Sequence, residues 1–243
     1  MLEWLVHPID PTRAHEVGVL LSWHGRLMVV AWGFCVPIGI LAARFFKVLP
    51  WQDWPKEVDN HVWWNTHRLA QYTALALMGV GLVLVLSEDG HAASITPTVW
   101  LHRVLGYATL LFGVGQLMSG WLRGSKGGPT DPGGHMRGDH YDMTPRRLLF
   151  ERYHKTVGYV ALSAAAATIL SGLWQANAPR WMWICLLGWW VFIAVVAVAL
   201  KSRGPTVSTY AAIWGPDPIH PGNRPASDEG GPFDTAGTAV HRR

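Results

Sequence analysis

The chain has 243 residues, of which half are hydrophobic and only 15% are charged. Soluble domains typically carry about 25% charged residues, so this composition argues against a soluble globular protein. The net charge of +4 is modest, and no nucleic-acid partner is expected. The first residues lack a basic stretch followed by an apolar one, so no cleaved signal peptide is expected either.

Five stretches of the sequence are long and apolar enough to cross a membrane, which takes roughly 20 mainly apolar residues. The first contains Pro37, and membrane helices tolerate such a proline when a neighbouring helix satisfies the freed carbonyl. The sequence therefore predicts an all-α integral membrane protein with five transmembrane helices. The five spans are residues 17–45, 62–86, 99–122, 156–179 (starting near Phe150) and 181–200.

Lys and Arg are unevenly distributed among the segments that connect these spans. The loop 123–152 carries six of them, whereas residues 87–98 on the opposite side carry none. Cytoplasmic loops are enriched in Lys and Arg, so the N-terminus is expected outside and the C-terminus in the cytoplasm, in a bacterial inner membrane. The chain then divides into an outer segment 1–16, a membrane domain 17–200 and an irregular cytoplasmic tail 201–243.

Four of the twelve histidines lie within spans, one in the first part of each of the first four. They are His24, His67, His102 and His154. An ionisable residue inside a bilayer is costly and points to a function. A hydrogen-bonded interhelical histidine would explain any one of them, but it does not explain one in each of four spans and none in the fifth.

The antiparallel course of consecutive spans predicts how these histidines pair. His24 and His102 are expected near the outer face, and His67 and His154 near the cytoplasmic face. Two histidines at the same depth on facing helices can supply both axial ligands of one haem iron. The first four helices are therefore expected to form an antiparallel bundle around two b haems. Zinc competes weakly, because four histidines split between two depths do not form one tetrahedral site.

The residues beside the histidines suit a porphyrin. His102 opens HRVLGY and His154 opens HKTVGY, so that Gly106 and Gly158 lie one turn deeper on the same helix face. A missing side chain there leaves room for a flat macrocycle, although close helix packing would also favour glycine. Basic residues next to the histidines are candidates to pair with haem propionates or to reach the lipid headgroups. They are Arg26, Arg68, Arg103 and Lys155.

Four motifs in order resemble the cytochrome b561 family, in particular its branch linked to DOMON domains and ferric reductases. They are SWHGRLMVVAWGFCVPIGILAARFFK (22–47), WWNTHRLAQ (63–71), LHRVLGYATLLFGVGQ (101–116) and FERYHKTVGY (150–159). The resemblance covers about residues 17–200. It implies a bundle with two b haems on the four matching histidines and electron transfer across the membrane. It also implies a cytoplasmic electron-donor site near Arg44 and Lys47.

The sequence also departs from this family. Its members commonly have six spans and are preceded by a DOMON domain, whereas only about sixteen residues precede the first span here. Three functions are compatible with the residues. The first is an electron conduit from quinol or another small reductant to an acceptor or redox protein on the other face. The second is a haem-bearing membrane-anchor subunit of a larger redox complex, and the third is a haem-free transporter or structural membrane protein.

Overall fold

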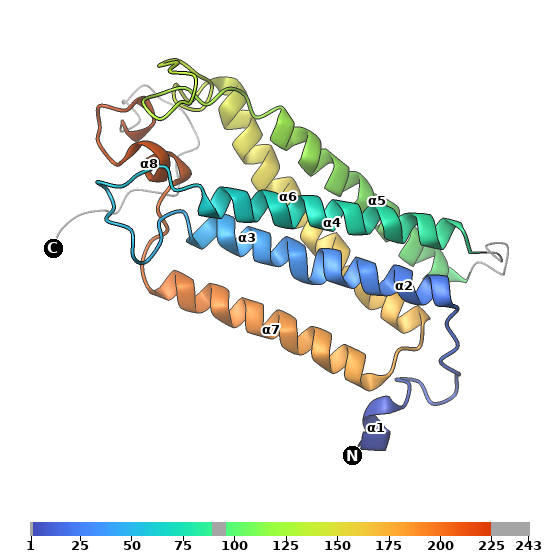
Figure 1. Cartoon of the computed structure of the whole chain (residues 1–243). Helices are drawn as coiled ribbons and strands as arrows, with labels where there is room; N and C mark the ends of the chain where they lie inside the picture. The colour runs from blue at the N-terminus through green and yellow to red at the C-terminus, as the bar shows by residue number, and fades with distance from the viewer. Residues whose placement is uncertain (1, 89–95, 225–243) are drawn as a thin grey trace.

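The computed structural model describes residues 2–88 and 96–224, and its regular elements within these ranges are all helical. Figure 1 shows the long helices lying side by side, with the N-terminus at one end of the molecule and α8 at the other. The elements are α1 (Leu2–Val6), α2 (Val19–Met28), the π-helix η1 (Val29–Cys35), α3 (Val36–Phe45), α4 (Val62–Leu86), α5 (Pro97–Trp121), α6 (Pro145–Gln175), α7 (Arg180–Ser202), α8 (Thr209–Trp214) and the 3-10 helix η2 (Pro221–Asn223).

Four long helices in the described residues are apolar enough to cross a membrane, which confirms that the protein is an integral membrane protein. They are Val19–Phe45, Val62–Leu86, Pro145–Gln175 and Arg180–Ser202. The remaining predicted span, residues 99–122, forms as α5, which has 25 residues, as many as α4. It is not among these four.

The first long helix runs without a break through Pro37, because α2, η1 and α3 are continuous. Proline has no N–H, so the carbonyl of Gly33 loses its usual donor four residues on. The indole Nε1 of Trp189, on α7, donates to that carbonyl at 2.9 Å instead. A neighbouring helix thus satisfies the freed carbonyl, and the widened π-helical turn lies at this point.

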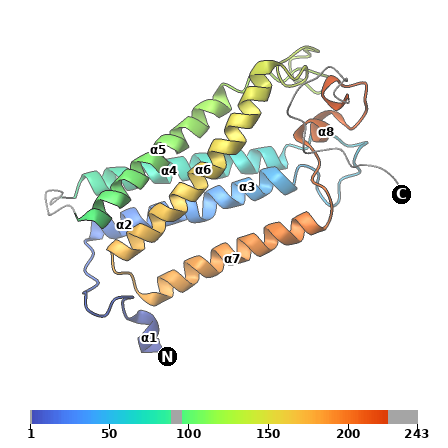
Figure 2. The same cartoon turned by 180° about the vertical axis from the view of Figure 1, so that it is seen from behind.

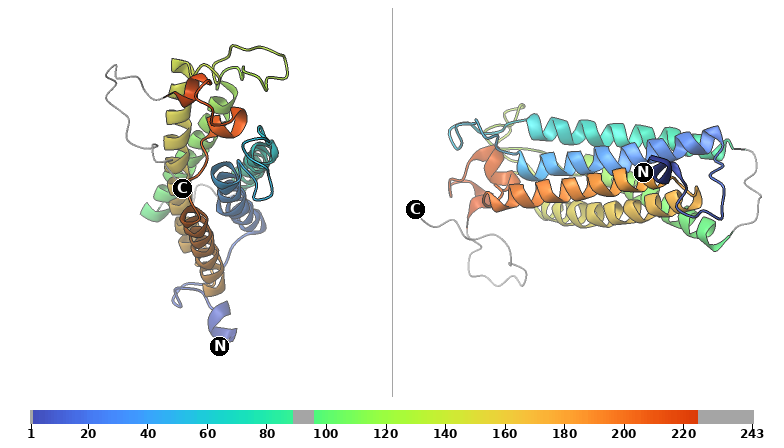
Figure 3. Two further views of the ribbon diagram at one scale, coloured as in Figure 1. Left: turned by 90° about the vertical axis from the view of Figure 1, so that its left-hand side faces the viewer. Right: turned by 90° about the horizontal axis from the view of Figure 1, so that it is seen from below.

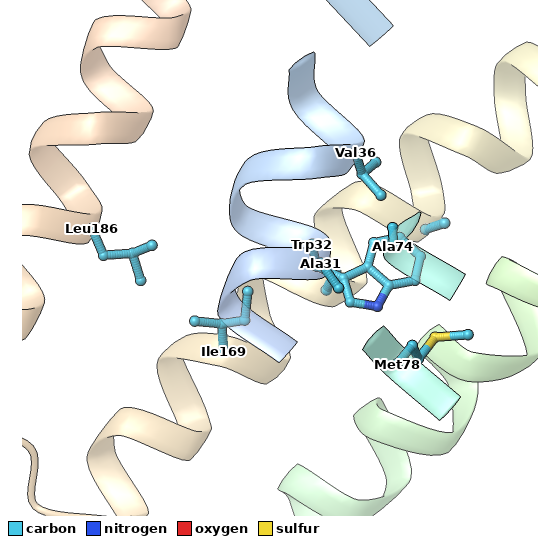
Figure 4. Close-up of a cluster of buried hydrophobic side chains, with 9 residues drawn as sticks. Ala31, Trp32, Val36, Ala74, Met78, Ile169 and Leu186 are labelled. Atoms are coloured by element: carbon cyan, nitrogen blue, oxygen red, sulfur yellow. The ribbon is translucent and has the colours of Figure 1, made fainter. Parts of the chain in front are cut away.

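The bundle consists of two helix pairs that meet at mid-length. The continuous helix Val19–Phe45 packs along α4, and α5 packs along α6, whereas α4 and α5 contact each other little. Figure 2 shows the second pair from behind, and Figure 3 shows α7 beside the continuous helix. Figure 4 shows the meeting point, where Trp32 and Met78 pack in one buried cluster with Ala161 and Ala165 of α6. The small alanine side chains allow α6 to approach closely there.

Each end of the bundle carries a folded segment. At the end where α2 begins, residues 2–15, here called the strap, bind along the turn between α6 and α7. At the other end, residues 123–144 and 207–223, here called the cap, pack on each other. The strap end and the cap end are named after these segments. The tail was expected to be irregular from residue 201, which is wrong for 209–223, because α8 and η2 form there and bury Tyr210 and Trp214.

Candidate functional site

The four histidines lie in two pairs, one towards each end of the bundle. His24 on α2 faces His102 on α5 with ring centres 6.4 Å apart and ring planes at 82°. His67 on α4 faces His154 on α6 with ring centres 6.3 Å apart and planes at 70°. The first pair lies towards the strap end and the second towards the cap end. These partners are the ones that the alternation of the helices predicts.

One ring nitrogen of each histidine on the first helix pair contacts a backbone carbonyl of the facing helix. Nδ1 of His24 lies 2.8 Å from the carbonyl oxygen of Gly81 on α4. Nδ1 of His67 lies 3.0 Å from the carbonyl oxygen of Gly39 on α3. A carbonyl only accepts hydrogen bonds, so Nδ1 carries the proton in both rings. Nε2 then keeps its lone pair.

Hydroxyl groups contact Nδ1 of both histidines in the second helix pair. The hydroxyl of Ser171 donates to the carbonyl of Thr168 at 2.8 Å, and that of Ser119 donates to Gln116 at 2.8 Å. Each serine oxygen is therefore left to accept from an imidazole N–H. Nδ1 of His102 lies 3.0 Å from the Ser171 oxygen, and Nδ1 of His154 lies 2.9 Å from the Ser119 oxygen. All four histidines thus have Nδ1 engaged, and in His24, His67 and His102 this leaves Nε2 available; Nδ1 of His154 lies 2.9 Å from the Ser119 oxygen and also 2.9 Å from the side-chain amide of Gln116.

Each ring pair has the spacing that one metal ion between two imidazoles requires. An imidazole nitrogen binds a metal ion at roughly 2.0–2.1 Å and the ring centre lies about 1 Å further, so two opposed rings stand roughly 6 Å apart. The observed separations of 6.4 and 6.3 Å match this value. Metal-binding histidines also typically donate their other ring N–H to a carbonyl or hydroxyl, which orients the ring. Both pairs therefore fit a haem iron with two axial histidines.

Comparison with known proteins agrees with this geometry. The family model described as eukaryotic cytochrome b561 matches residues 23–124, which include three of the four paired histidines. The chain belongs to the cytochrome b561 family. Membership implies a haem b cofactor.

The individual relatives are longer proteins. A cytochrome b561, DM13 and DOMON domain-containing protein of Arabidopsis thaliana is 28% identical over 186 residues, which are 74% of this chain and 18% of that protein. Ferric-chelate reductase 1 of Homo sapiens is 30% identical over 166 residues, 66% of this chain and 23% of that protein. This cytochrome b561 chain therefore spans less than a quarter of either relative. No solved structure matches it.

Glycines let the ring partners of this cytochrome b561 approach closely, and they are not the glycines that the sequence singled out. A Cβ on Gly39 would lie 2.6 Å from Nε2 of Gln71, and one on Gly172 would lie 3.0 Å from Cε1 of His102. The predicted Gly106 and Gly158 are less crowded. The nearest atoms to a Cβ there would be Thr168 at 3.8 Å and Gln116 at 3.5 Å. A Cβ at either glycine would thus make ordinary van der Waals contact without a clash.

The predicted basic residues have different surroundings. The guanidinium of Arg26 lies over Trp23, and that of Arg68 lies over both Trp64 and Tyr72. Lys155 forms an ion pair with Glu151 at 3.0 Å, and Arg103 is half-buried beside His102 on α5. The guanidinium of Arg123, one of the six charges of the loop 123–152, lies 4.2 Å from the ring centre of Trp64. Burial, together with the nearby cations of Arg147 and Arg68, lowers the pKa of Arg123.

Both residues of the expected electron-donor site are engaged within the chain. Arg44 donates to the hydroxyl of Tyr159 at 2.6 Å, and the Nζ of Lys47 donates to the carbonyl of Val207 at 3.0 Å. Burial, with the nearby charge of Lys155, lowers the pKa of Lys47 to about 8. The cap therefore contacts this basic rim at Lys47, whereas Arg44 bonds to α6 and remains exposed.

Proposed function

We propose that this cytochrome b561 binds two b haems and conducts electrons from one face of the membrane to the other. His24 and His102 would hold one haem at the strap end, and His67 and His154 would hold the second at the cap end. The observation that carries the proposal is the matched geometry of the two pairs. Both have ring centres 6.3–6.4 Å apart, and all four Nδ1 atoms are held by the surrounding helices.

The chain's own residues would orient the haem ligands and separate the two haem sites along the bundle. A haem held by each histidine pair would supply one-electron redox chemistry. The carbonyls of Gly39 and Gly81 orient two of the rings and make them better ligands. The buried cluster around Trp32 fills the space between the two pairs and excludes water from it. Gly106 and Gly158 would leave room for the macrocycles.

We further propose that α5 also crosses the membrane, which gives five transmembrane spans in total. It carries His102, it packs along the length of α6, and its length equals that of α4. On α5, His102 and the half-buried Arg103 would face the bundle. The exposed apolar side chains of α5, including Leu111 and Val114, would face lipid. With five spans and the basic loop 123–152 inside, the strap end would be outside and the cap end cytoplasmic, as in a bacterial inner membrane.

The basic residues beside the histidines extend the proposal. Arg26, Arg68 and Arg103 would pair with haem propionates, because none of them forms an ion pair in the part of the chain that the structure describes. Lys155 already pairs with Glu151 and would contribute charge from further away. The partners would be a quinol or small reductant on one face and, on the other, a redox protein or a ferric chelate, which the name of the ferric-chelate reductases suggests.

Haem content and redox titration of the purified full chain test this function. The expected result is two haems per chain, with low-spin spectra and two separable midpoint potentials. A single haem would contradict the conduit, because one haem near one face cannot carry an electron across a hydrocarbon core about 30 Å thick. A colourless preparation that does not take up added haem would contradict any haem function.

A further inference from the structure

The cap is a built structure with its own aromatic core. Tyr210 and Trp214 of α8 are each only 5% exposed and pack against Tyr141 of the loop 123–144. The hydroxyl of Tyr210 donates to the carbonyl of Tyr141 at 2.8 Å, and the hydroxyl of Tyr141 lies 3.1 Å from Nδ1 of His220. The two parts of the cap, about 70 residues apart along the chain, therefore hold each other in place.

The cap is also fastened to the rim of the bundle. The backbone N–H of Asp59, just before α4, donates to the carbonyl of Ala212 at 2.9 Å. The carboxylate of Asp59 binds the ammonium group of Lys126 in the cap loop. On the other side of the rim, Lys47 donates to Val207. The connection between α3 and α4 is thereby tied to both parts of the cap.

A chain of side-chain contacts runs from the cap down to the cap-end histidines. The ring of Trp214 lies 4.7 Å from that of His140, and Nε2 of His140 accepts from Arg147 at 3.0 Å. The guanidinium of Arg147 lies 5.0 Å from the ring centre of Phe150, which lies 5.2 Å from that of His154. The cap is therefore connected to the cap-end pair by a continuous row of side-chain contacts along α6, in which His140 and Arg147 are buried.

We propose that the cap closes the cap-end site to water-soluble reductants, so that the electron donor at this end is a lipid-soluble quinol. This inference rests on the proposed function. An anionic reductant would need the positive rim, where Lys47 is partly buried and bonded to the carbonyl of Val207 in the cap, whereas Arg44 is bonded to Tyr159 of α6 and stays exposed. A quinol approaches from the bilayer and does not pass the cap. It loses two electrons, one at a time, to oxidised haem and releases two protons to become a quinone.

Reduction kinetics of the full chain, followed by stopped flow with ascorbate or with duroquinol, test the proposal. They are measured in wild type and in a His102→Ala background, which leaves only the cap-end haem to be reduced. Trp214→Ala removes the centre of the cap, and Ile219→Ala, at a side chain 71% exposed on the same segment, is the matched control. We expect rapid reduction by duroquinol and slow reduction by ascorbate in the His102→Ala protein. Adding Trp214→Ala should accelerate reduction by ascorbate but not by duroquinol. Adding Ile219→Ala should change neither rate of reduction.

A second measurement does not depend on haem. Acylation of Lys47 by a water-soluble amine reagent, followed by mass spectrometry, should be slow in wild type and in Ile219→Ala but fast in Trp214→Ala. If Trp214→Ala does not accumulate, Ala212→Glu places a charge at a cap position only 1% exposed and serves in its place.

Two results would overturn the closed cap. One is reduction of the cap-end haem by ascorbate as fast as by duroquinol in the protein with an intact cap. The other is equal Lys47 labelling with and without Trp214. A protein that binds no haem, or whose haem even dithionite does not reduce, would instead contradict the proposed function and would leave the labelling result to decide whether the cap is closed.

Discussion

The side-chain amide of Asn177 holds the backbone of Asp10 on both sides of that residue. Its Oδ1 accepts from the N–H of Asp10 at 3.0 Å, and its Nδ2 donates to the carbonyl of Asp10 at 2.9 Å and to that of Arg13 at 2.6 Å. Asn177 is only 2% exposed and has a positive φ of 46°. One side chain in the turn between α6 and α7 thus fixes the strap.

Replacing Asn177 should release the strap. Asn177→Gly removes three hydrogen bonds but keeps the backbone conformation, and we expect a loss of roughly 2 kcal/mol in the free energy that binds the strap. Asn177→Ala should lose about 1 kcal/mol more, because alanine disfavours a positive φ. Hydrogen exchange of the amides of residues 2–15 measures both effects. Unchanged exchange in both variants would show that other contacts fix the strap.

Single substitutions of the four paired histidines should fall into two classes. His24→Ala and His102→Ala should each lose the strap-end haem and keep the other, and His67→Ala and His154→Ala should do the reverse. The helices should still pack, because the buried cluster around Trp32 lies between the two pairs. Haem stoichiometry with redox titration distinguishes the classes. The pairing is falsified if His24 and His67 remove the same redox component.

Trp189→Phe should destabilise the bundle by roughly 1–3 kcal/mol. Phenylalanine keeps most of the ring but has no N–H, so the carbonyl of Gly33 is left unsatisfied in an apolar environment. Thermal unfolding in detergent measures the change. Trp181→Phe, at a half-exposed position on the same helix, is the control and should be nearly neutral. Equal stability of the two variants would mean that water reaches Gly33.

The cap should loosen in acid because of His140. Burial is the main cause that lowers its pKa from 6.5 to about 3, with the Arg147 cation next. Between these two values an opened cap binds a proton that the closed cap excludes, so the stability of the closed cap falls as the pH drops from about 6.5 towards 3. Hydrogen exchange of residues 209–215, corrected for intrinsic rates, should show this fall. His140→Gln does not titrate and should flatten it, although Glu151 nearby leaves some dependence; an unaltered slope would exclude His140.

The pairing of the histidines could be predicted because it depends only on helix direction and on the position of each histidine within its span. The carbonyl groups that accept hydrogen bonds from Nδ1 of these histidines could not be predicted. Any carbonyl on a facing helix is equally plausible in sequence, and only the packing selects Gly39 and Gly81. For the same reason Gly106 and Gly158, chosen by their distance from a histidine along the chain, are less closely packed than Gly172.

The strap and the cap could not be predicted either, since neither has a regular apolar period. The cap packs through single aromatic side chains, such as Tyr210 and Trp214, brought together from loops far apart in the sequence. The strap binds mainly through backbone groups, and these leave no signal in the residue types. The effect of Pro37, in contrast, could be predicted, because proline always lacks the N–H that would bond to the carbonyl four residues before it. The need of the Gly33 carbonyl for another donor therefore followed from Pro37 alone.

The bond between Trp189 and Gly33 also has a consequence for biosynthesis. The ribosome completes the first helix about 150 residues before it makes Trp189, so the Gly33 carbonyl must enter the bilayer without its final partner. A nascent chain that stops before α7 would keep that polar group in contact with lipid or with trapped water. Completion of the first helix therefore depends on the last span, because only a chain translated through α7 contains the indole that bonds to the Gly33 carbonyl. Truncated products would remain recognisable to membrane quality control.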